Sequence, residues 1–268
     1  MGKPQGIVEL QSKRSNLEKE PWKSVPSFSG KIESKFVFDM YTSSTILPFR
    51  SLSPDKTIMP VHEGKVLSSS NAQNQLWPNF AIWWADANAT WNELRGSQKM
   101  DLEERINYQN TLINQFPLPG RRIVYTTSGT NLTAAIIDNE RSIIESNLYW
   151  AACPNLLEAD YLSAILNSNV ANDGVKPMQA KGNFGPRHFH LHVWKLPFPE
   201  FNQQNELHLR ISELGKTARE LVGNLELPLD KGHVALRKIV NSHLNDHGVQ
   251  SAIDSEVAQL LMLSATSV

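Results

Sequence analysis

Residues Gly182 to Phe201, GNFGPRHFHLHVWKLPFPEF, divide the chain into two parts of different character. Glycines frame a loop at the start of this stretch, histidines then alternate with apolar residues, and Pro197 and Pro199 mark its exit. Alternation at every second residue predicts a strand. The sequence predicts mixed strands and helices before this stretch, and helices alone after it. We therefore expect the fold to change at Phe201.

The composition is that of a globular protein. The chain has 268 residues, of which 40% are hydrophobic, so it is long enough to bury a core. Its apolar runs, such as Ala134 to Ile137, are far shorter than the roughly 20 residues that cross a bilayer. We expect a cytoplasmic protein with no membrane partner. The single cysteine, Cys153, excludes an internal disulfide and is expected to be a buried thiol.

The formal net charge of −1 does not favour an autonomous nucleic-acid binder, which usually carries a basic surplus. Charge can still be segregated on the surface. The first 200 residues carry cations near predicted loops or strands, whereas many acids lie on predicted helices. These cations are Lys31, Lys35, Arg50, Arg121, Arg122, Lys181, Arg187 and Lys195. The alternative, scattered charges that keep the protein in solution, stays open.

The first 120 residues predict short strands followed by helices. Residues 1–30 are polar and lack periodicity, which is typical of a loose arm. An alternating run then places Phe36, Phe38 and Met40 on one side of a strand, and Glu63-Gly64 predicts a tight turn between two short strands. Four tryptophans follow between positions 77 and 91, where they could stack on bases but more often form a core.

Further on, capping residues and turns define the elements. Asp101 and Glu104 have the spacing of a capping box and predict an amphipathic helix over 101–116. The β-branched run 122–138, interrupted at 128–131, predicts a hairpin. A strand over 142–150, a helix over 156–168 and three tail helices over 205–222, 233–246 and 254–263 complete the prediction. The tail helices could pack on one another, on the mixed domain or on a second protein.

The alternating histidines His188, His190 and His192 share one face of the predicted strand. Such a face could bind zinc, which would make the chain a zinc hydrolase or lyase. Zinc binding requires a specific set of ligands, however. His208, which could serve as a further ligand, lies in a stretch of helical periodicity and not on a strand. We favour polar contacts on a half-exposed strand, and zinc binding stays the alternative.

Several motifs occur together in a fixed order. They are Leu148-Tyr-Trp150, EADYLSAILNS at 158–168, Arg187-His188 after the glycine loop, and VWKLPFPEF at 193–201. In that order they resemble the C-terminal part of adenine-specific DNA methyltransferases from restriction-modification and related phage-defence systems of bacteria. The resemblance runs from about Lys31 to the C-terminus. In that family this part is the target recognition region, which reads the DNA sequence beside the catalytic domain.

The resemblance implies an α+β, target-recognition-domain-like fold with a mixed sheet and helices, followed by a C-terminal helical segment. It divides the chain into a loose arm (1–30), a target recognition domain (31–201) and a helical tail (202–268). Two hallmarks of the complete enzyme are missing from the sequence. There is no Pro-Pro dipeptide, around which the family builds its base-binding tetrapeptide, and no glycine-rich turn between a strand and a helix. We therefore expect no catalysis by this chain alone, and S-adenosylmethionine only on a catalytic partner or a missing domain.

The expected partners are double-stranded DNA and a methyltransferase catalytic domain or subunit. Arginine suits guanine or phosphate, and asparagine and serine suit adenine or backbone oxygens. The candidate DNA contacts are Arg121, Arg122, Ser128, Asn131, Asn183, Arg187 and Lys195. Each could instead be a surface residue or turn former. We assign Tyr149, Trp150, Trp194 and Phe201 to core packing, and a protein-interaction scaffold derived from such a domain is the alternative function.

Overall fold

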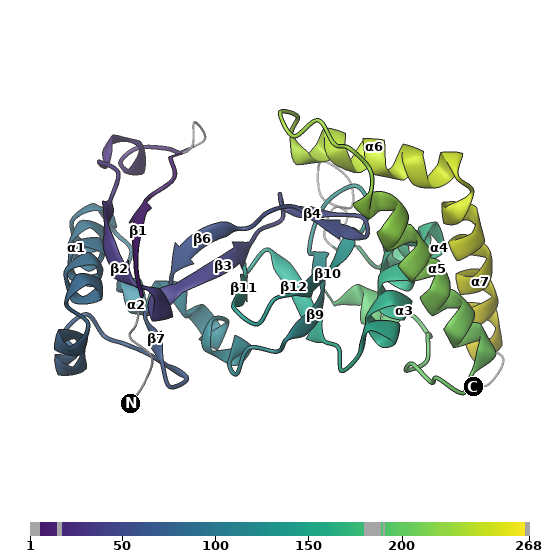
Figure 1. The fold of residues 1–268 in the computed structure, drawn as a ribbon, viewed down its shortest axis with the longest axis horizontal. Helices are drawn as coiled ribbons and strands as arrows, with labels where there is room; N and C mark the ends of the chain where they lie inside the picture. Colours follow the sequence, from purple (N-terminus) through teal and green to yellow (C-terminus); the bar gives the residue numbers. More distant parts are fainter. Residues whose placement is uncertain (1–5, 15–17, 180–188, 190, 266–268) are drawn as a thin grey trace. The chain divides into compact units, whose positions relative to one another are not determined.

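The computed structural model describes residues 6–14, 18–179, 189 and 191–265 and divides into two compact units (Figure 1). Unit 1 consists of residues 1–39 and 56–118, and unit 2 consists of residues 40–55 and 119–268. The described residues form seven α-helices and several small sheets, which confirms the mixed α+β class with helices at the C-terminal end. Strands β3 (Val37–Tyr41) and β6 (Asp55–Ile58) contain two of the points at which the chain passes between the units.

Unit 1 packs one long helix on a two-stranded sheet. Strand β1 (Ile7–Gln11) pairs antiparallel with β2 (Ser29–Glu33), and α1 (Pro78–Leu94) lies against β2. The rings of Phe36 and Phe80 stack with their centroids 3.8 Å apart in the core beneath. The described part of the expected loose arm thus contains a strand, because β2 supplies backbone partners that local periodicity could not reveal.

The tryptophans of unit 1 belong partly to its core, as the sequence predicts. Trp77 and Trp84 are buried, and the Trp84 indole N–H donates to the carbonyl oxygen of Leu67 at 3.0 Å. The ammonium of Lys35 lies 3.6 Å from the centre of the Trp77 ring. A buried indole N–H needs a hydrogen-bond acceptor, which the Leu67 carbonyl provides for Trp84.

The predicted tight turn is confirmed, and it joins β7 (Val61–His62) to β8 (Lys65–Val66). Glu63 and Gly64 have left-handed φ values of +48° and +72°, which this kind of two-residue hairpin turn requires. Short 3₁₀ helices occupy the connections before and after it. These are η1 (Trp22–Ser24), η2 (Ser34–Phe36) and η3 (Ala72–Leu76).

The helix predicted over 101–116 begins correctly but ends early. The capping box is confirmed, since the Asp101 carboxylate accepts from the Glu104 N–H at 2.7 Å and Glu104 accepts from the Asp101 N–H at 3.1 Å. Helix α2 nevertheless covers only Leu102–Ile106, and two 3₁₀ turns, η4 (Tyr108–Asn110) and η5 (Ile113–Gln115), follow. The Asn107 side chain accepts from the Ile113 N–H at 3.0 Å, and such bonds compete with the helix backbone.

The central sheet of unit 2 has the order β10-β9-β12, with both neighbours antiparallel to β9. The hairpin of β9 (Arg121–Thr126) and β10 (Ala134–Asp138) confirms the prediction. The strand predicted over 142–150 is two strands, β11 (Ser142–Ile144) and β12 (Leu148–Ala152). A turn separates them, closed by a bond of 2.9 Å from the Leu148 N–H to the Glu145 carbonyl.

A small hairpin lies beside this sheet. Strands β4 (Ile46–Leu47) and β5 (Arg50–Ser51) pair antiparallel, and the Phe49 N–H donates to the carbonyl oxygen of Ala134 at 2.9 Å. The hairpin therefore joins β10 through the backbone.

The described residues of unit 2 form five α-helices, and the three longest of these agree in position with the predicted tail helices. They are α3 (Leu156–Asn167), α4 (Asn169–Val175), α5 (Glu206–Gly223), α6 (His233–Asp246) and α7 (Val249–Ala265). Two 3₁₀ helices, η6 (Lys176–Met178) and η7 (His192–Lys195), lie between α4 and α5. Asn205 caps α5 as predicted, since its side chain accepts from the N–H groups of Leu207 and His208.

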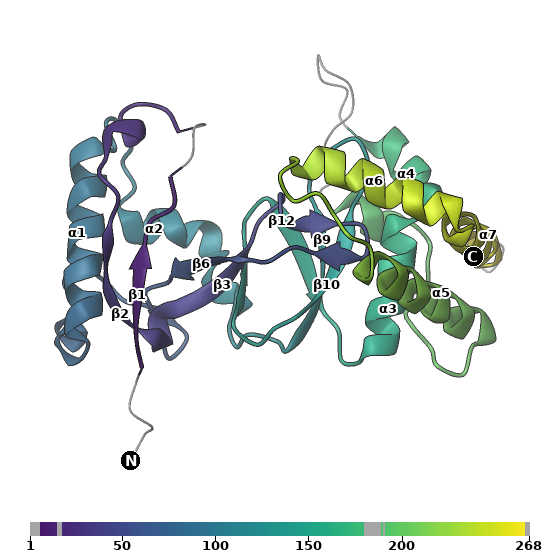
Figure 2. The ribbon, with the colours of Figure 1, turned by 45° about the horizontal axis from the view of Figure 1, so that its top comes forward.

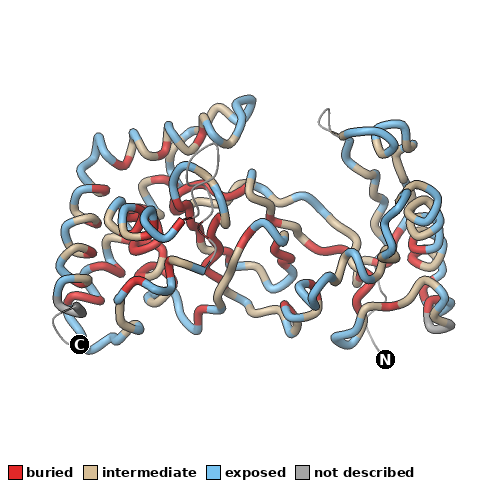
Figure 3. The backbone as a smooth tube through the Cα atoms, turned by 180° about the vertical axis from the view of Figure 1, so that it is seen from behind, coloured by how far each residue is buried: buried red, intermediate tan, exposed pale blue. Residues whose placement is uncertain are grey.

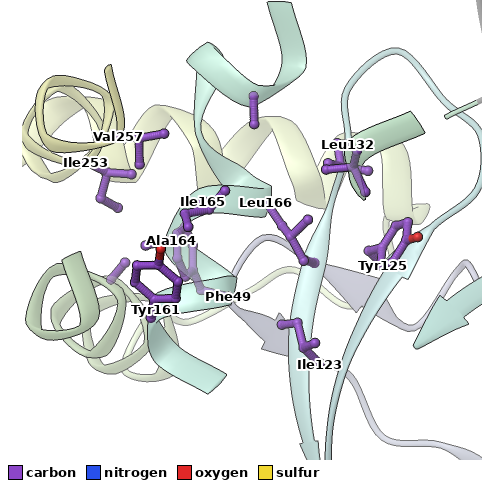
Figure 4. Close-up of a cluster of buried hydrophobic side chains, with 14 of the residues drawn as sticks. Phe49, Ile123, Tyr125, Leu132, Tyr161, Ala164, Ile165, Leu166, Ile253 and Val257 are labelled. Carbon is purple, nitrogen blue, oxygen red and sulfur yellow. The ribbon is translucent and has the colours of Figure 1, made fainter. Parts of the chain in front are cut away.

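The tail helices pack on the mixed part of unit 2 and on one another. Helix α3 lies between the sheet and the helices α5 and α7, and Figure 4 shows Tyr161 and Ile165 between the sheet and Ile253. The backbones of α3 and α5 approach so closely that a Cβ at Gly215 would overlap the carbonyl oxygen of Asp160. The contacts between α3 and α5 cross the predicted domain boundary at 201/202. This boundary therefore stays a prediction.

Buried residues of unit 2 follow α3 and the central sheet, which Figure 3 shows in red. The largest core cluster of this unit extends from the sheet to α7, and a second cluster that includes Val124, Ile137 and Leu148 packs on the same sheet. Among the helices formed by the described residues, none has the length and apolar character that crossing a bilayer requires.

Candidate nucleic-acid interface

Strand β9 separates the candidate DNA contacts into two groups. Arg121 and Arg122 open the strand, whereas Ser128 and Asn131 lie in the loop beyond its end. At a rise of about 3.3 Å per residue, the two ends are roughly 20 Å apart. The two groups therefore lie in different surroundings.

Arg121 is held within the sheet surface. Its guanidinium forms an ion pair of 2.9 Å with Asp138, the residue opposite it in the β9–β10 register. Both side chains are partly exposed, at 24% for Arg121 and 61% for Asp138. An exposed cross-strand pair of this kind adds little stability, but it occupies the arginine.

Arg122 is fully buried. Its Nη2 donates to the carbonyl oxygen of Ser142 at 2.7 Å, and its guanidinium lies 4.8 Å from the centre of the Trp150 ring. Burial lowers the pKa of Arg122 to about 10, so it keeps its charge at neutral pH. Arg122 has no side-chain surface for a nucleic acid here, and its observed contacts are those of a core residue.

The loop after β9 presents Ser128 and Asn131 to solvent. Its two ends are tied by a bond of 3.0 Å from the Thr126 N–H to the Thr133 carbonyl. The Asn172 side chain, on α4, accepts from the Leu132 N–H at 2.6 Å. The loop is therefore anchored to the sheet and to a helix, which is typical of loops that bind ligands.

The turn between β11 and β12 lies next to this loop. Both the N–H and the hydroxyl of Thr127 donate to the carbonyl oxygen of Asn147, at 3.3 and 2.9 Å. Ser146 and Asn147 are exposed there. The turn adds further hydroxyl and amide groups to the same end of the sheet.

The segment that leads into η7 reaches this end as well. The Phe189 N–H donates to the carbonyl oxygen of Thr127 at 2.7 Å, and the Trp194 indole N–H donates to the Tyr125 hydroxyl at 2.7 Å. Burial raises the pKa of Tyr125, so its hydroxyl stays protonated. Lys195 is exposed beside Trp194. The structure thus brings Ser128, Asn131 and Lys195 to one end of the sheet.

The prediction that Trp194 belongs mainly to the core is wrong, because this side chain is 38% exposed. Its indole contacts the rings of Tyr125 and Phe198. Base or sugar rings stack favourably on an exposed tryptophan that has a lysine beside it. The adjacent Lys195 and the proline that follows two residues later were the available signals of an exposed turn.

Asn183 and Arg187 lie outside the described residues, as do His188 and His190. His192 begins the 3₁₀ helix η7 instead of continuing a strand, and its N–H donates to the Phe189 carbonyl at 2.9 Å. The strand prediction is therefore wrong at His192, because a turn buries Phe189 and Val193. Within the described part of the chain, no group of three or more His, Cys, Asp or Glu side chains could hold a metal ion.

The fold is similar to part of a restriction-modification enzyme. A solved structure of the Type IIL restriction-modification enzyme MmeI in complex with DNA matches with a TM-score of 0.53 and 11% sequence identity. The match covers 84% of this chain and 28% of the MmeI chain, so this chain spans less than a third of that enzyme. No family model matches the sequence, and no curated protein matches it. The likeness establishes a shared fold.

Proposed function

We propose that the chain is the DNA-recognition part of a restriction-modification system with an adenine-specific methyltransferase. The observation that carries the proposal is the fold, which is shared with less than a third of an enzyme solved in complex with DNA. Support also comes from the loop after β9, the turn at 145–147 and η7, whose exposed hydroxyl, amide and ammonium groups gather at one end of the sheet. These are groups that contact base edges and phosphates.

In this proposal the interface has two kinds of contact. Ser128 and Asn131 meet base edges or backbone oxygens, and Lys195 binds phosphate. Asn183 and Arg187 belong to the proposed interface on the strength of the sequence alone. Arg121 and Arg122 take no direct part, because one is paired with Asp138 and the other is buried.

Methyl transfer is assigned to a partner. The sequence has no Pro-Pro dipeptide from which a base-binding tetrapeptide could be built, so a separate catalytic domain or subunit would hold S-adenosylmethionine and the flipped adenine. The chain would then supply the choice of target sequence, and its partner would supply the chemistry.

The test is duplex binding by the full chain, alone and together with a co-expressed methyltransferase partner. Fluorescence anisotropy with a labelled pool of random duplexes should show binding that weakens steeply as salt rises, because counterions are released from phosphate. Repeated selection from the pool should enrich one short sequence. Absence of duplex binding at low salt in both preparations contradicts the proposal.

A protein-interaction scaffold derived from such a domain is the second candidate. The formal net charge of −1 favours it, since a DNA-binding domain usually carries a basic surplus. Stable association with a large methyltransferase subunit, combined with no duplex affinity in the complex, supports the scaffold over the recognition module.

A further inference from the structure

Helix α6 has one apolar side and one polar side. Leu236, Val240 and Leu244 are buried against the rest of unit 2. The opposite side faces solvent and follows the 4-3-4 spacing of a single helical face. It consists of the exposed residues Val234, Lys238 and Asn245 and the half-buried Asn241, with the exposed Ser242 alongside.

The charge on α6 differs from that on its two neighbours. Its sequence contains no carboxylate before Asp246, its last residue. The exposed side of α5 carries Glu206, Glu213 and Glu220, and α7 carries two acids of its own. Among these three helices, α6 is the one whose exposed side combines a cation with neutral amides. Such a side suits a polyanion, whereas acidic helices repel one.

Arg237 anchors α6 to the hairpin of β4 and β5. Its guanidinium donates to the carbonyl oxygen of Ile46 at 2.9 Å and to that of Ser43. Burial lowers the pKa of Arg237 to about 10, so it still carries a positive charge beneath the helix at neutral pH. The anchor fixes the position of the helix on unit 2.

This anchor connects α6 to the candidate interface. The Ser43 N–H donates to the Glu145 carboxylate at 3.4 Å, in the turn that also contains Asn147. Asn147 in turn accepts both bonds from Thr127, next to Ser128. Figures 1 and 2 both show α6 beside β4, in agreement with the contacts between them. Helix α6 is therefore linked to the loop after β9 through Ser43 and the turn at 145–147.

We propose that the exposed side of α6 lies in the major groove of the bound DNA and reads base pairs beside those contacted by the loop after β9. The inference rests on the proposed function and adds a second reading element to it. Lys238 and Asn245 are about 10 Å apart along the helix, at 1.5 Å per residue. The major groove is about 12 Å wide and admits a helix. Asparagine pairs with the N6 and N7 edge of adenine, and lysine pairs with guanine or phosphate.

The experiment compares Asn241→Ala, Asn245→Ala and Lys238→Ala in the full chain with its partner. Each protein is titrated with the selected duplex and with duplexes changed at one base pair at a time. We expect each asparagine variant to lose roughly 5- to 100-fold of discrimination at one base pair. If Lys238 binds phosphate, Lys238→Ala should weaken binding and flatten its salt dependence. If Lys238 binds guanine, the variant should lose discrimination at one further base pair.

Two matched variants control for charge and side-chain type. Lys216→Ala removes a lysine from α5, and Gln259→Ala removes an exposed amide from α7. Both should bind the selected duplex as the unchanged protein does. Thermal unfolding of every variant shows whether a loss of binding comes from a loss of structure.

The outcomes separate the inference from the function on which it rests. If the α6 variants bind and discriminate normally while Ser128→Ala and Asn131→Ala weaken binding, α6 is not a reading element and the proposed function stands. If both asparagine variants lose affinity equally on all duplexes, with discrimination unchanged, α6 touches only the DNA backbone and the groove assignment is overturned. If the unchanged protein binds no duplex, both proposals fail.

Discussion

The polar side chains at the two ends of strand β9 differ in their exposure to solvent. At its start, Arg121 is paired with Asp138 and Arg122 is buried beneath Trp150. Beyond its end, Ser128 and Asn131 carry no charge but stand exposed on an anchored loop. A buried cation must find partners inside the protein, so it is no longer available to a ligand. Exposure, more than charge, therefore decides which of these residues are available to a ligand.

Thiol reactivity gives the largest expected contrast between the two ends. Cys153 follows β12 and lies beside the start of β9, where its N–H donates to the Arg121 carbonyl, and burial raises the pKa of its thiol to about 11. A cysteine introduced by Ser128→Cys should have an ordinary pKa. From the thiolate fractions at pH 8 alone, with an ordinary pKa of 9.0 at position 128, Cys153 should react with an aromatic disulfide about 90-fold more slowly.

The rates are measured by absorbance in the native protein, with Cys153→Ala in the background to isolate position 128. Bound duplex should slow the reaction at position 128 further and leave Cys153 unchanged. Equal rates at the two positions contradict the burial of the Cys153 thiol.

Raising the pH tests the same burial through stability. The folded pKa of Cys153 lies above its ordinary value of 9.0, so its stabilising contribution is present below pH 9 and is lost as pH rises from about 9 to about 11. The urea midpoint should fall across this window, and it should fall less in Cys153→Ala. A parallel decline in both proteins assigns the loss to other groups.

Replacing the buried arginine should weaken the fold. Arg122→Ala leaves a cavity and removes the donor to the Ser142 carbonyl, so we expect the free energy of unfolding to fall by about 3 kcal/mol. Arg122→Met keeps most of the volume and should cost less. Urea denaturation measures both. A variant that is stable but no longer binds duplex would instead identify Arg122 as a DNA contact.

Replacing the loop residues should weaken DNA binding and leave the stability of the fold nearly unchanged. Ser128→Ala with Asn131→Ala removes exposed polar groups, so binding to the duplex should weaken by about 1 to 3 kcal/mol for each base edge that is no longer hydrogen-bonded. The free energy of unfolding should change by less than about 0.5 kcal/mol, as for most surface substitutions. The matched pair Ser255→Ala with Gln259→Ala, on α7, should bind normally. Unchanged affinity of the loop variant removes this loop from the interface.

Arg121→Ala should have the smallest effect. The pair with Asp138 is partly exposed, so its loss should cost about 0.5 kcal/mol of stability and leave duplex affinity unchanged. Asp138→Ala and the double variant complete a cycle that measures the pair directly. A salt-dependent loss of DNA binding in Arg121→Ala, but not in Asp138→Ala, contradicts the assigned role.

The elements that the sequence predicts well are those with local signals. Asp101 and Asn205 cap helices because their own side chains reach the adjacent N–H groups. The hairpin of β9 and β10 follows from two β-branched runs and the turn residues between them. The helix predicted over 101–116 is too long, because the Asn107 side chain closes a bond that periodicity does not reveal.

Local patterns in the sequence predict the class of the fold, the helices of the C-terminal part and the kinds of side chain available for binding. Which of these side chains meet solvent depends on tertiary packing. Arg122, predicted as a contact, lies in the core, and Trp194, predicted in the core, is exposed. The reason is that burial depends on what packs against a strand, and the partners of Arg122 come from Ser142 and Trp150, about 20 to 28 residues further along the chain.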